Sequence, residues 1–276
     1  MSKFTYDDEG LTPAKKVVLA SVAPIALALL IALLTLVVLN APSRPAYAQT
    51  DRLPDLGMAY PKSFLIENTS DGRKLLRFAS TVVNVGAGPL ELHGQRPDSS
   101  ASEMTVTQRI FDDAGGYRDV PTSAIMIWGG DGHNHWHVKD LEYFQLERLD
   151  NGVKVGTYAK HGFCFFDNFN YGSPDPAFYT PKLTQSCGGG LSATQTMMGL
   201  SPGWGDKYGR ALVGQYIDIT GLTPGQYRLI GTADASDWFL ESDNANNVTW
   251  VDIRLTATDK VRILARGPSA PQYTAP

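Results

Sequence analysis

Short alternating segments separated by turn residues dominate the sequence after residue 50. The chain contains 27 Gly and 17 Pro, and both residue types interrupt helices and form turns. No segment of this region shows a clear helical period of 3.6, whereas several segments alternate apolar and polar residues with a period of 2. We therefore predict an all-β fold, in the form of an antiparallel β-sandwich.

The strand pattern is clearest in six segments: residues 75–78, 81–85, 90–92, 216–219, 227–230 and 248–255. Residues 216–219 and 227–230 flank the turn signal Thr223-Pro224-Gly225-Gln226, which predicts a hairpin between them. In the last segment, alternation is expected to place the side chains of residues 251, 253 and 255 on one face.

One long uncharged segment precedes this region. Residues 17–39 (VVLASVAPIALALLIALLTLVVL) carry no charge, and about 20 apolar residues are enough to cross a bilayer. The lysines at positions 15 and 16 should remain cytoplasmic, so the rest of the chain is expected outside the cytoplasm. An uncleaved transmembrane signal anchor and a signal peptide cleaved near Ala48, after Ala46-Tyr47-Ala48, both remain open.

These signals divide the chain into five parts: a cytoplasmic N-terminus (1–16), a signal or transmembrane helix (17–40), a linker (41–55), one globular domain (56–256) and a C-terminal tail (257–276). The net charge of −4 and the 24 Lys and Arg residues argue against a nucleic-acid partner, because phosphate binding requires a basic surface. The membrane is an expected partner only through the N-terminal segment.

The chain has two cysteines, Cys164 and Cys187, and both lie in the exported part. In an oxidising compartment such a pair most simply forms one disulfide, with two free buried thiols as the alternative. A CxxC metal site is excluded because the two residues are far apart in the sequence.

Three of the five histidines lie in a single run, at His133, His135 and His137. In a strand these positions project to the same side, so the three imidazoles can converge on a metal ion if the strand curls. Imidazole binds Cu, Zn, Ni and Fe. Spacing alone does not choose the metal, and a zinc hydrolase remains open on these residues.

Several segments resemble, in the same order, the catalytic domain of the lysyl oxidase family. The HxHxH run resembles the copper motif of that family, and Lys160-His161-Gly162-Phe163-Cys164 resembles the segment that carries its cofactor lysine. The segments from Gly199 to Gly203 and from Lys207 to Gly209 resemble the one that carries the cofactor tyrosine, and residues 241–247 (ESDNANN) resemble the closing segment. The resemblance extends over residues 52–255, which makes 56–256 a lysyl oxidase-like catalytic domain.

The resemblance implies a specific chemistry. Lysyl oxidases use copper and lysine tyrosylquinone, a cofactor formed from their own side chains, and by position Lys160 and Tyr208 would form it here. The expected reaction oxidises primary amines, with peptidyl lysine as one candidate, to aldehydes with release of ammonia and hydrogen peroxide, and O2 is the co-substrate. The alternative is an exported copper-binding protein with the same fold but no quinone and no oxidase activity.

The sequence also departs from the family pattern. Family members have acidic residues shortly after the cofactor tyrosine, whereas the matching segment here, residues 209–213, has no carboxylate. Asp206 and Asp218 are the available substitutes, so the general base is left open. His161 follows the lysine, whereas the family has a histidine before it, and we expect His161 to be neither a base nor a neighbour of the site.

A last cluster of oxygen-bearing side chains lies in residues 243–247 (DNANN). Calcium binds such oxygens, but Asp and Asn residues before a strand more commonly form a turn. The turn is the interpretation that we favour.

Overall fold

The structure is a computed structural model that describes residues 50–129, 133–172 and 187–273. The predicted signal or transmembrane segment lies outside the described residues. Among the residues that are described, none belongs to a helix with the length and apolar character needed to cross a membrane.

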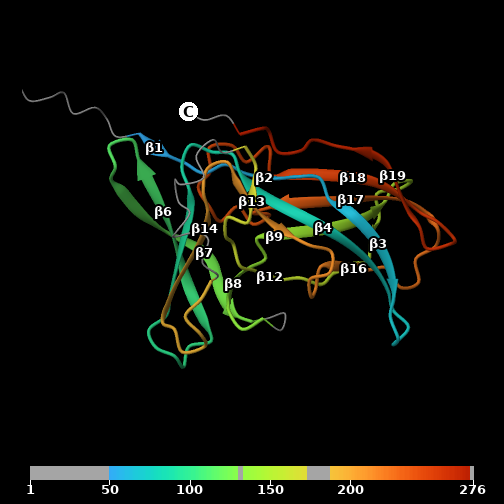
Figure 1. The fold of residues 1–276 in the computed structure, drawn as a ribbon, viewed down its shortest axis with the longest axis horizontal. Coiled ribbons are helices and arrows are strands. Elements are labelled where there is room, and N and C mark those ends of the chain that lie inside the picture. The colour runs from blue at the N-terminus through green and yellow to red at the C-terminus, as the bar shows by residue number, and fades with distance from the viewer. Residues whose placement is uncertain (1–49, 130–132, 173–186, 274–276) are drawn as a thin grey trace, which may run out of the picture. The chain divides into compact units, whose positions relative to one another are not determined.

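Three antiparallel sheets make up the described part of the chain. The first has the order β12-β8-β7-β6-β5-β14, and β1 pairs with β6. Its strands are β1 (Asp51–Arg52), β5 (Leu90–Gln95), β6 (Glu103–Asp112), β7 (Tyr117–Trp128), β8 (Trp136–Lys139), β12 (Gly162–Phe163) and β14 (Gln195–Leu200). In Figure 1 this sheet lies at the opposite end of the domain from β3 and β19.

The second sheet has the order β10-β9-β17-β18-β19. Its strands are β9 (Glu142–Arg148), β10 (Lys154–Val155), β17 (Gly225–Ala233), β18 (Val248–Leu255) and β19 (Val261–Arg266).

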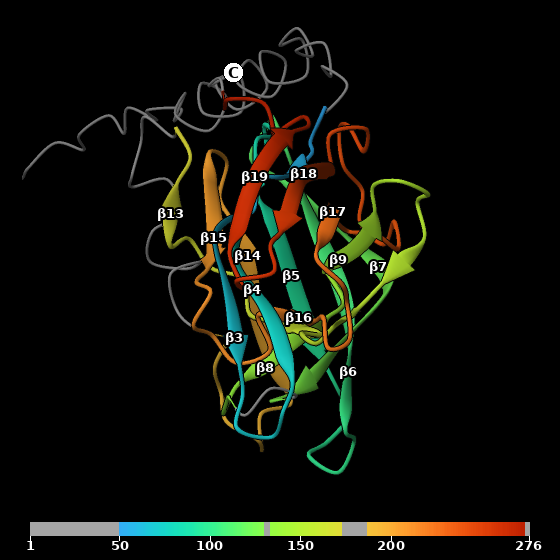
Figure 2. The same ribbon diagram turned by 90° about the vertical axis from the view of Figure 1, so that its right-hand side faces the viewer.

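The third sheet is built around the long strand β4, which pairs with β2, β3, β15 and β16 (Figure 2). Its strands are β2 (Leu56–Met58), β3 (Lys62–Asn68), β4 (Lys74–Asn84), β11 (Thr157–Tyr158), β13 (Phe169–Asn170), β15 (Trp204–Tyr208) and β16 (Tyr216–Asp218).

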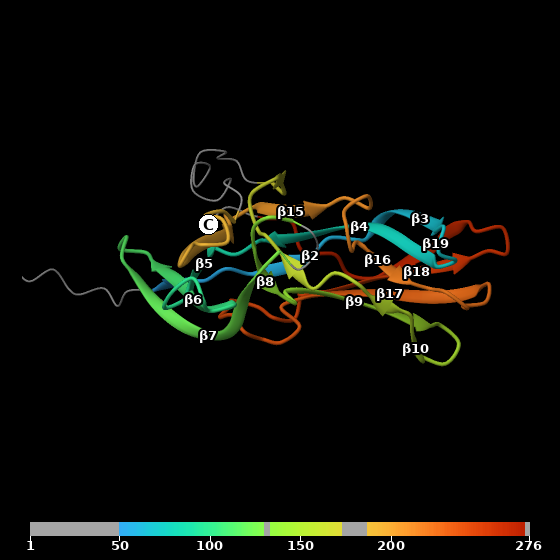
Figure 3. The same cartoon turned by 90° about the horizontal axis from the view of Figure 1, so that it is seen from below.

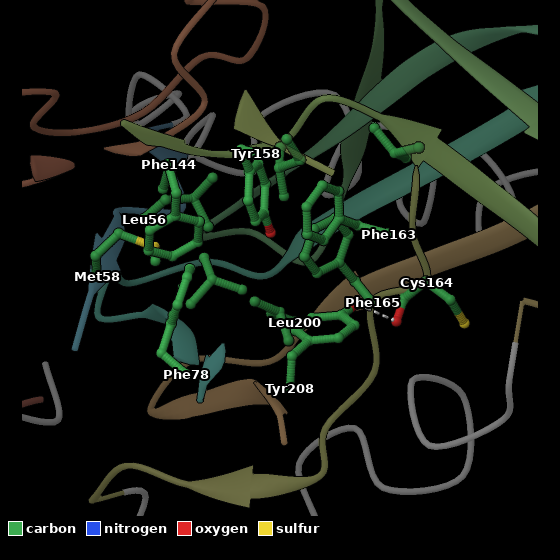
Figure 4. Packing of buried hydrophobic residues seen from close by; sticks show 14 of the residues in the cluster. Leu56, Met58, Phe78, Phe144, Tyr158, Phe163, Cys164, Phe165, Leu200 and Tyr208 are labelled. Carbon is green, nitrogen blue, oxygen red and sulfur yellow. Dashed lines mark hydrogen bonds between the residues drawn. The ribbon is translucent and has the colours of Figure 1, made fainter. Parts of the chain in front are cut away.

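The second and third sheets pack face to face and enclose an aromatic core (Figure 3). Phe78 of β4 is fully buried, and its ring centroid lies 4.8 Å from that of Phe144 in β9 and 6.3 Å from that of Tyr158. Figure 4 shows these rings in one continuous cluster with Phe163, Phe165 and Tyr208. The aromatic core therefore reaches from the interface between the sheets to the residues that the sequence analysis assigned to the cofactor.

The prediction of an all-β, antiparallel fold is confirmed, and no helix occurs among the described residues. The predicted strands 75–78 and 81–85 are one continuous strand, β4, because Ala79 and Ser80 extend the pairing between them. In β18, residues 251, 253 and 255 are all buried, as expected. A simple two-sheet sandwich does not account for the first sheet, which adds seven strands.

The predicted hairpin between residues 216–219 and 227–230 is wrong. The first segment, as β16, pairs with β4 and β11, whereas the second, as β17, pairs with β9 and β18. The connecting turn thus carries the chain from one sheet to the facing one, because each of the two strands pairs with strands of a different sheet. In addition, β19 and the hydrogen bond from Ala270 N to Met58 O (2.9 Å) lie within the segment expected to be a tail.

Replacement of Phe78 by alanine tests the role of the aromatic core. We expect Phe78→Ala to lower the free energy of unfolding by about 3–5 kcal/mol, because it removes a fully buried ring and leaves a cavity. Leu65→Ala in the neighbouring strand β3 is the control, since this side chain is 43% exposed. Denaturant unfolding curves that gave equal losses for the two variants would contradict this account of the core.

Candidate active site

The three predicted metal ligands converge at the start of β8. One ligand atom from each of His133, His135 and His137 can be chosen so that all lie within 4.8 Å of one another. His137 is buried at 1% exposure, and the other two are half-buried. The carbonyl of His135 accepts a hydrogen bond from Gly129 N (2.9 Å), so the pairing of β7 with β8 extends into the histidine run.

Trp136 anchors this run from the opposite face of the strand. The side chain is fully buried, and its indole Nε1 donates to the carbonyl of Gly190 (3.1 Å). Its backbone N donates to the carbonyl of Cys187 (3.1 Å), and Cys187 forms the predicted disulfide with Cys164. The disulfide therefore links Cys187, which is hydrogen-bonded to the histidine run through Trp136, to Cys164, which directly follows β12.

Gly162 provides the space that the His137 ring occupies. A Cβ atom at Gly162 would lie 2.6 Å from His137 Nδ1 and 2.9 Å from its Cγ. Gly162 is fixed opposite Lys139 by the pairing of β12 with β8. Only a residue without a side chain fits at this position while the imidazole keeps its place.

The donor set fits a transition metal. Three neutral imidazoles are suitable ligands for Cu(II), Zn(II), Ni(II) or Fe(II), and three protein ligands leave further coordination positions for small molecules. Among the described residues, the side chains of His133, His135 and His137 are the group of three His, Cys, Asp or Glu residues that lie close enough together to share one metal ion.

Lys160 and Tyr208, which are 48 positions apart, lie together in the interior. Both are buried, with 2% and 7% of their surface exposed, and Lys160 Nζ lies 5.2 Å from the centroid of the Tyr208 ring. The same ammonium lies 5.3 Å from the ring of Phe163, which packs edge-on against Tyr208. Phe163 pairs with Val138, next to His137, so the lysine and the histidines share the β8–β12 region.

The hydroxyl of Tyr208 donates a hydrogen bond to the carbonyl of Cys164 (2.9 Å; Figure 4). Burial raises the pKa of Tyr208 well above its usual value, and the nearby carboxylates of Asp206 and Glu142 raise the pKa further. The phenol is therefore held in its neutral form, fixed at both its ring and its hydroxyl.

Two fully buried carboxyl groups accompany this pair. Asp206 precedes Tyr208 by two positions in β15, so both side chains project to the same face, and Asp206 accepts a hydrogen bond from Asn168 Nδ2. Glu142 begins β9 and accepts a hydrogen bond from Ser80 Oγ (2.8 Å). Burial raises the pKa of each carboxyl group to about 8, although the positive charge of Lys160 acts in the opposite direction.

Ser80 connects the carboxyl cluster to the strand opposite Tyr208. It is the cross-strand partner of Tyr208 in the pairing of β15 with β4. Its hydroxyl donates to Glu142 and accepts a hydrogen bond from Gln215 Nε2 (3.1 Å). Because Ser80, Glu142 and Gln215 are all at most 1% exposed, this is a polar network inside the protein core.

The other two residues considered from the sequence lie outside this cluster. Asp218 accepts hydrogen bonds from Thr220, chiefly its hydroxyl, and these lower the pKa of Asp218. His161 is 58% exposed and pairs with Asp140 at 2.7 Å. Of the two substitutes for the missing carboxylate, only Asp206 lies beside Tyr208, and the expectation that His161 is not part of the site agrees with its position.

Sequence reasoning missed Glu142, Ser80, Gln215 and Tyr158, all of which line the buried cluster. Glu142 left no signal, because a charged residue at the start of a strand is ordinarily exposed, and only the structure shows that this one is buried. The contacts of Ser80 and Gln215 depend on the packing of separate sheets and could not have been found from local patterns.

The segment 241–247 forms a turn before β18, as favoured from the sequence. Its side chains hold the start of β2. Glu241 accepts hydrogen bonds from Leu56 N and from Asn247 Nδ2 (3.0 Å), and Asn246 Nδ2 donates to Asp55 (2.6 Å).

Comparison with known proteins agrees with this geometry. The sequence profile of the lysyl oxidase family matches residues 104–264, which is more than half of the chain and includes the histidines, Lys160 and Tyr208. The chain belongs to the lysyl oxidase family.

Curated relatives include protein-lysine 6-oxidase of Homo sapiens, which is 34% identical over 126 residues, and that of Gallus gallus, 33% identical over 125 residues. Lysyl oxidase homolog 1 of Homo sapiens is 32% identical over 130 residues. These matches cover 45% of this chain but only 27% of each protein-lysine 6-oxidase and 20% of the homolog. This chain therefore matches only about a quarter of the length of these relatives.

Gly162→Ala tests the packing of the metal ligand. The added Cβ would displace the His137 ring, so we expect the affinity for Cu(II) to fall about 10–100-fold, the loss typical of disturbing a group that orients a ligand. Gly209→Ala is the control, because a Cβ there has no atom within 4 Å. Competition titration with a chelator measures both affinities, and equal affinities would refute the role of Gly162.

A pH series tests the buried carboxyl group of Asp206. Its pKa in the folded chain (about 8) lies above the usual 3.8, so its contribution to the free energy of unfolding should fall as pH rises through this window, by at most about 1.4 kcal/mol per pH unit. Asp206→Asn should remove this contribution in the copper-free chain and make the slope shallower, while Glu142 and Glu241, whose pKa values are also raised to about 8, keep the rest of it. Asp218→Asn is the matched control with the opposite sign, because the pKa of Asp218 is lowered: the substitution should cost stability at neutral pH, and this cost should disappear only as pH falls through the lowered pKa of the folded chain. Parallel curves for the wild type and Asp206→Asn would contradict the burial argument.

Proposed function

We propose that this chain is an exported, copper-dependent amine oxidase whose lysine tyrosylquinone forms from Lys160 and Tyr208. The observation that carries the proposal is the burial of the Lys160 amine 5.2 Å from the centre of the Tyr208 ring. Burial of an amine is costly unless a specific interaction compensates for it, so this placement requires a chemical reason. Membership of the lysyl oxidase family supplies that reason.

The reaction that we propose converts a primary amine, O2 and water into an aldehyde, ammonia and hydrogen peroxide. The cofactor supplies the two-electron oxidation, and the protein positions the reacting groups and excludes water. Phe163 restricts the position of Tyr208 from the side, and the Cys164 carbonyl fixes its hydroxyl. Peptidyl lysine is the substrate that we propose, as the names of the protein-lysine 6-oxidases suggest.

His133, His135 and His137 are the copper ligands in this proposal. Their imidazoles can converge within 4.8 Å, a donor set that suits Cu(II). Copper with O2 would supply the oxidation of the Tyr208 ring. In support, the pairing of β12 with β8 sets Phe163, whose ring packs against Tyr208, opposite Val138, the residue after His137.

Asp206 is the general base that we propose. It shares a face of β15 with Tyr208 and is buried at 1% exposure. A carboxyl group with a pKa of about 8 accepts protons far more readily at neutral pH than an ordinary aspartate. Asp218, the other candidate, lies away from the ring and has a lowered pKa.

Export is supported by the disulfide between Cys164 and Cys187, since such bonds persist in oxidising compartments. We propose that the N-terminal segment delivers the domain to the outside of the cytoplasm and, if it stays uncleaved, anchors it to the membrane.

Intact mass and peroxide release together test the oxidase. We expect the copper-loaded wild-type chain to differ in mass from the unmodified disulfide-bonded chain by the oxidation and cross-link, to stain for a quinone, and to release peroxide on addition of a primary amine. Tyr208→Phe should lose the mass difference, the stain and more than 99% of the peroxide while it keeps its copper, because the phenol is needed only for the cofactor.

The matched control is Tyr216→Phe, which removes a phenol hydroxyl from a partly buried tyrosine of β16 and should change none of the three. A colourless, copper-replete wild type of unmodified mass would refute the oxidase and favour the alternative, an exported copper-binding protein without the quinone.

A further inference from the structure

Arg96 is a buried cation beside the histidine run. It directly follows β5 and is 4% exposed. Its guanidinium carbon lies 4.6 Å from the centre of the Trp136 ring. Trp136 stands between His135 and His137 in the sequence and is fully buried. Arg96 therefore packs on the residue that separates two of the candidate metal ligands, although it comes from a different part of the chain.

The side-chain hydrogen bonds of Arg96 go to backbone carbonyls. Nε donates to the carbonyl of Ala193 (2.8 Å), Nη2 to that of Leu191, and Nη1 to those of Ser99 (3.3 Å) and Ala101. Burial of a charged group is costly unless its hydrogen-bonding groups are satisfied. A planar guanidinium can serve several carbonyls at once because its N–H donors form a fixed fork. One side chain therefore fastens two loops to each other, one before β6 and one before β14.

The loop before β14 also binds Trp136. It runs from Cys187 to Thr194 in the described part of the chain. The carbonyl of Cys187 accepts from the backbone N of Trp136 (3.1 Å), and that of Gly190 accepts from its indole Nε1 (3.1 Å). The backbone N of Arg96 donates to the carbonyl of Thr194 (3.0 Å), which continues the pairing of β5 with β14. Arg96 and Trp136 thus hold the same loop and also contact each other.

The position of the indole determines how the neighbouring imidazoles are directed. β8 begins at Trp136 and continues with His137, and neighbouring side chains of a strand project to opposite faces. His135 precedes Trp136, and its carbonyl accepts from Gly129 N in the extension of the same pairing. A displacement of the buried indole is therefore passed through the backbone to the histidine on either side of it.

We propose that Arg96 is a positioning residue of the metal centre, which fixes the indole of Trp136 and thereby the arrangement of His135 and His137 around copper. Arg96 does not bind the ion. The three imidazoles can converge within 4.8 Å, and Arg96 keeps them in one arrangement when the ion binds. The inference rests on the proposed function for the assignment of copper to these histidines.

Arg96→Lys tests this role, because it keeps the positive charge and removes the fork of N–H donors. We expect the affinity for Cu(II), measured by competition with a chelator, to fall about tenfold, at the lower end of the effect of groups that orient metal ligands. The EPR spectrum of the Cu(II)-loaded wild type should show one set of hyperfine lines. Arg96→Lys should add a second set, because its imidazoles are no longer confined to one arrangement.

Arg109→Lys is the matched control. Arg109 also belongs to the first sheet, stacks on an aromatic ring (Tyr117, 3.8 Å) and uses its fork on Asp119. Both partners lie in the first part of β7, whereas β8 pairs with residues 126–128 at its end. We therefore expect this variant to keep the single set of lines and a copper affinity within about twofold of the wild type.

A double-mutant cycle tests whether Arg96 acts through Trp136. Trp136→Phe keeps an aromatic ring but removes the Nε1 donor to Gly190 and part of the surface under the guanidinium. It should also lower the copper affinity and add a second set of lines. Since the two residues act on the same loop, the loss caused by Arg96→Lys should be at least about threefold smaller in the Trp136→Phe background than in the wild type.

The outcomes are distinct. An Arg96→Lys variant with wild-type affinity and a single set of lines would overturn the role of Arg96 and leave the oxidase intact. An equal loss in Arg109→Lys, or an undiminished loss in the Trp136→Phe background, would do the same. If Arg96→Lys gives no folded protein, the spectrum of Trp136→Phe decides: a second set of lines supports the proposal, and a single set overturns it.

The same measurements separate this inference from the proposed function. A wild type that binds copper but forms no quinone would refute the oxidase, and the copper affinities and spectra of the variants would still decide the role of Arg96. A wild type that binds no copper would refute both.

Discussion

The burial of a lysine amine beside a tyrosine ring is the constraint on which the rest of this structure depends. An ammonium is costly to remove from water, and here the cost is offset by Glu142, Asp206 and the faces of Phe163 and Tyr208. These partners come from three strands, β9, β12 and β15, one in each sheet, so all three sheets must be assembled before the lysine is stabilised. The same assembly places the phenol, the amine and the carboxyl groups within reach of one another.

The disulfide and Trp136 join this interior to the histidine run. Cys164 accepts the hydrogen bond from Tyr208 through its carbonyl and is bonded to Cys187, whose own carbonyl accepts from Trp136 between two of the histidines. Gly162 then allows the His137 ring to pack directly on β12, next to Lys160. One short stretch of chain, residues 160–164, therefore contacts the metal ligands, the tyrosine and the disulfide.

Much of the fold was predictable because local alternation and turn residues report it. The position of β18 and its buried face followed from period 2 alone, and the antiparallel all-β class followed from many short strands without a helical period. The hairpin at residues 216–230 failed for a physical reason: a turn signal shows that the chain reverses, but it does not show which sheet each strand joins. Strand β19 was missed because all but one of its residues are exposed and it lacks an alternating apolar pattern.

The sequence by itself determined the candidate metal ligands, the disulfide pair and, through family resemblance, the lysine and the tyrosine, since these are properties of residue type, spacing and order. Only the tertiary structure decided which carboxyl groups accompany the lysine: it selected Asp206 over Asp218 and revealed Glu142 with Ser80 and Gln215. Proton affinity in a protein interior depends on burial and on neighbours from distant strands, and neither is encoded in the local pattern around any one of these residues.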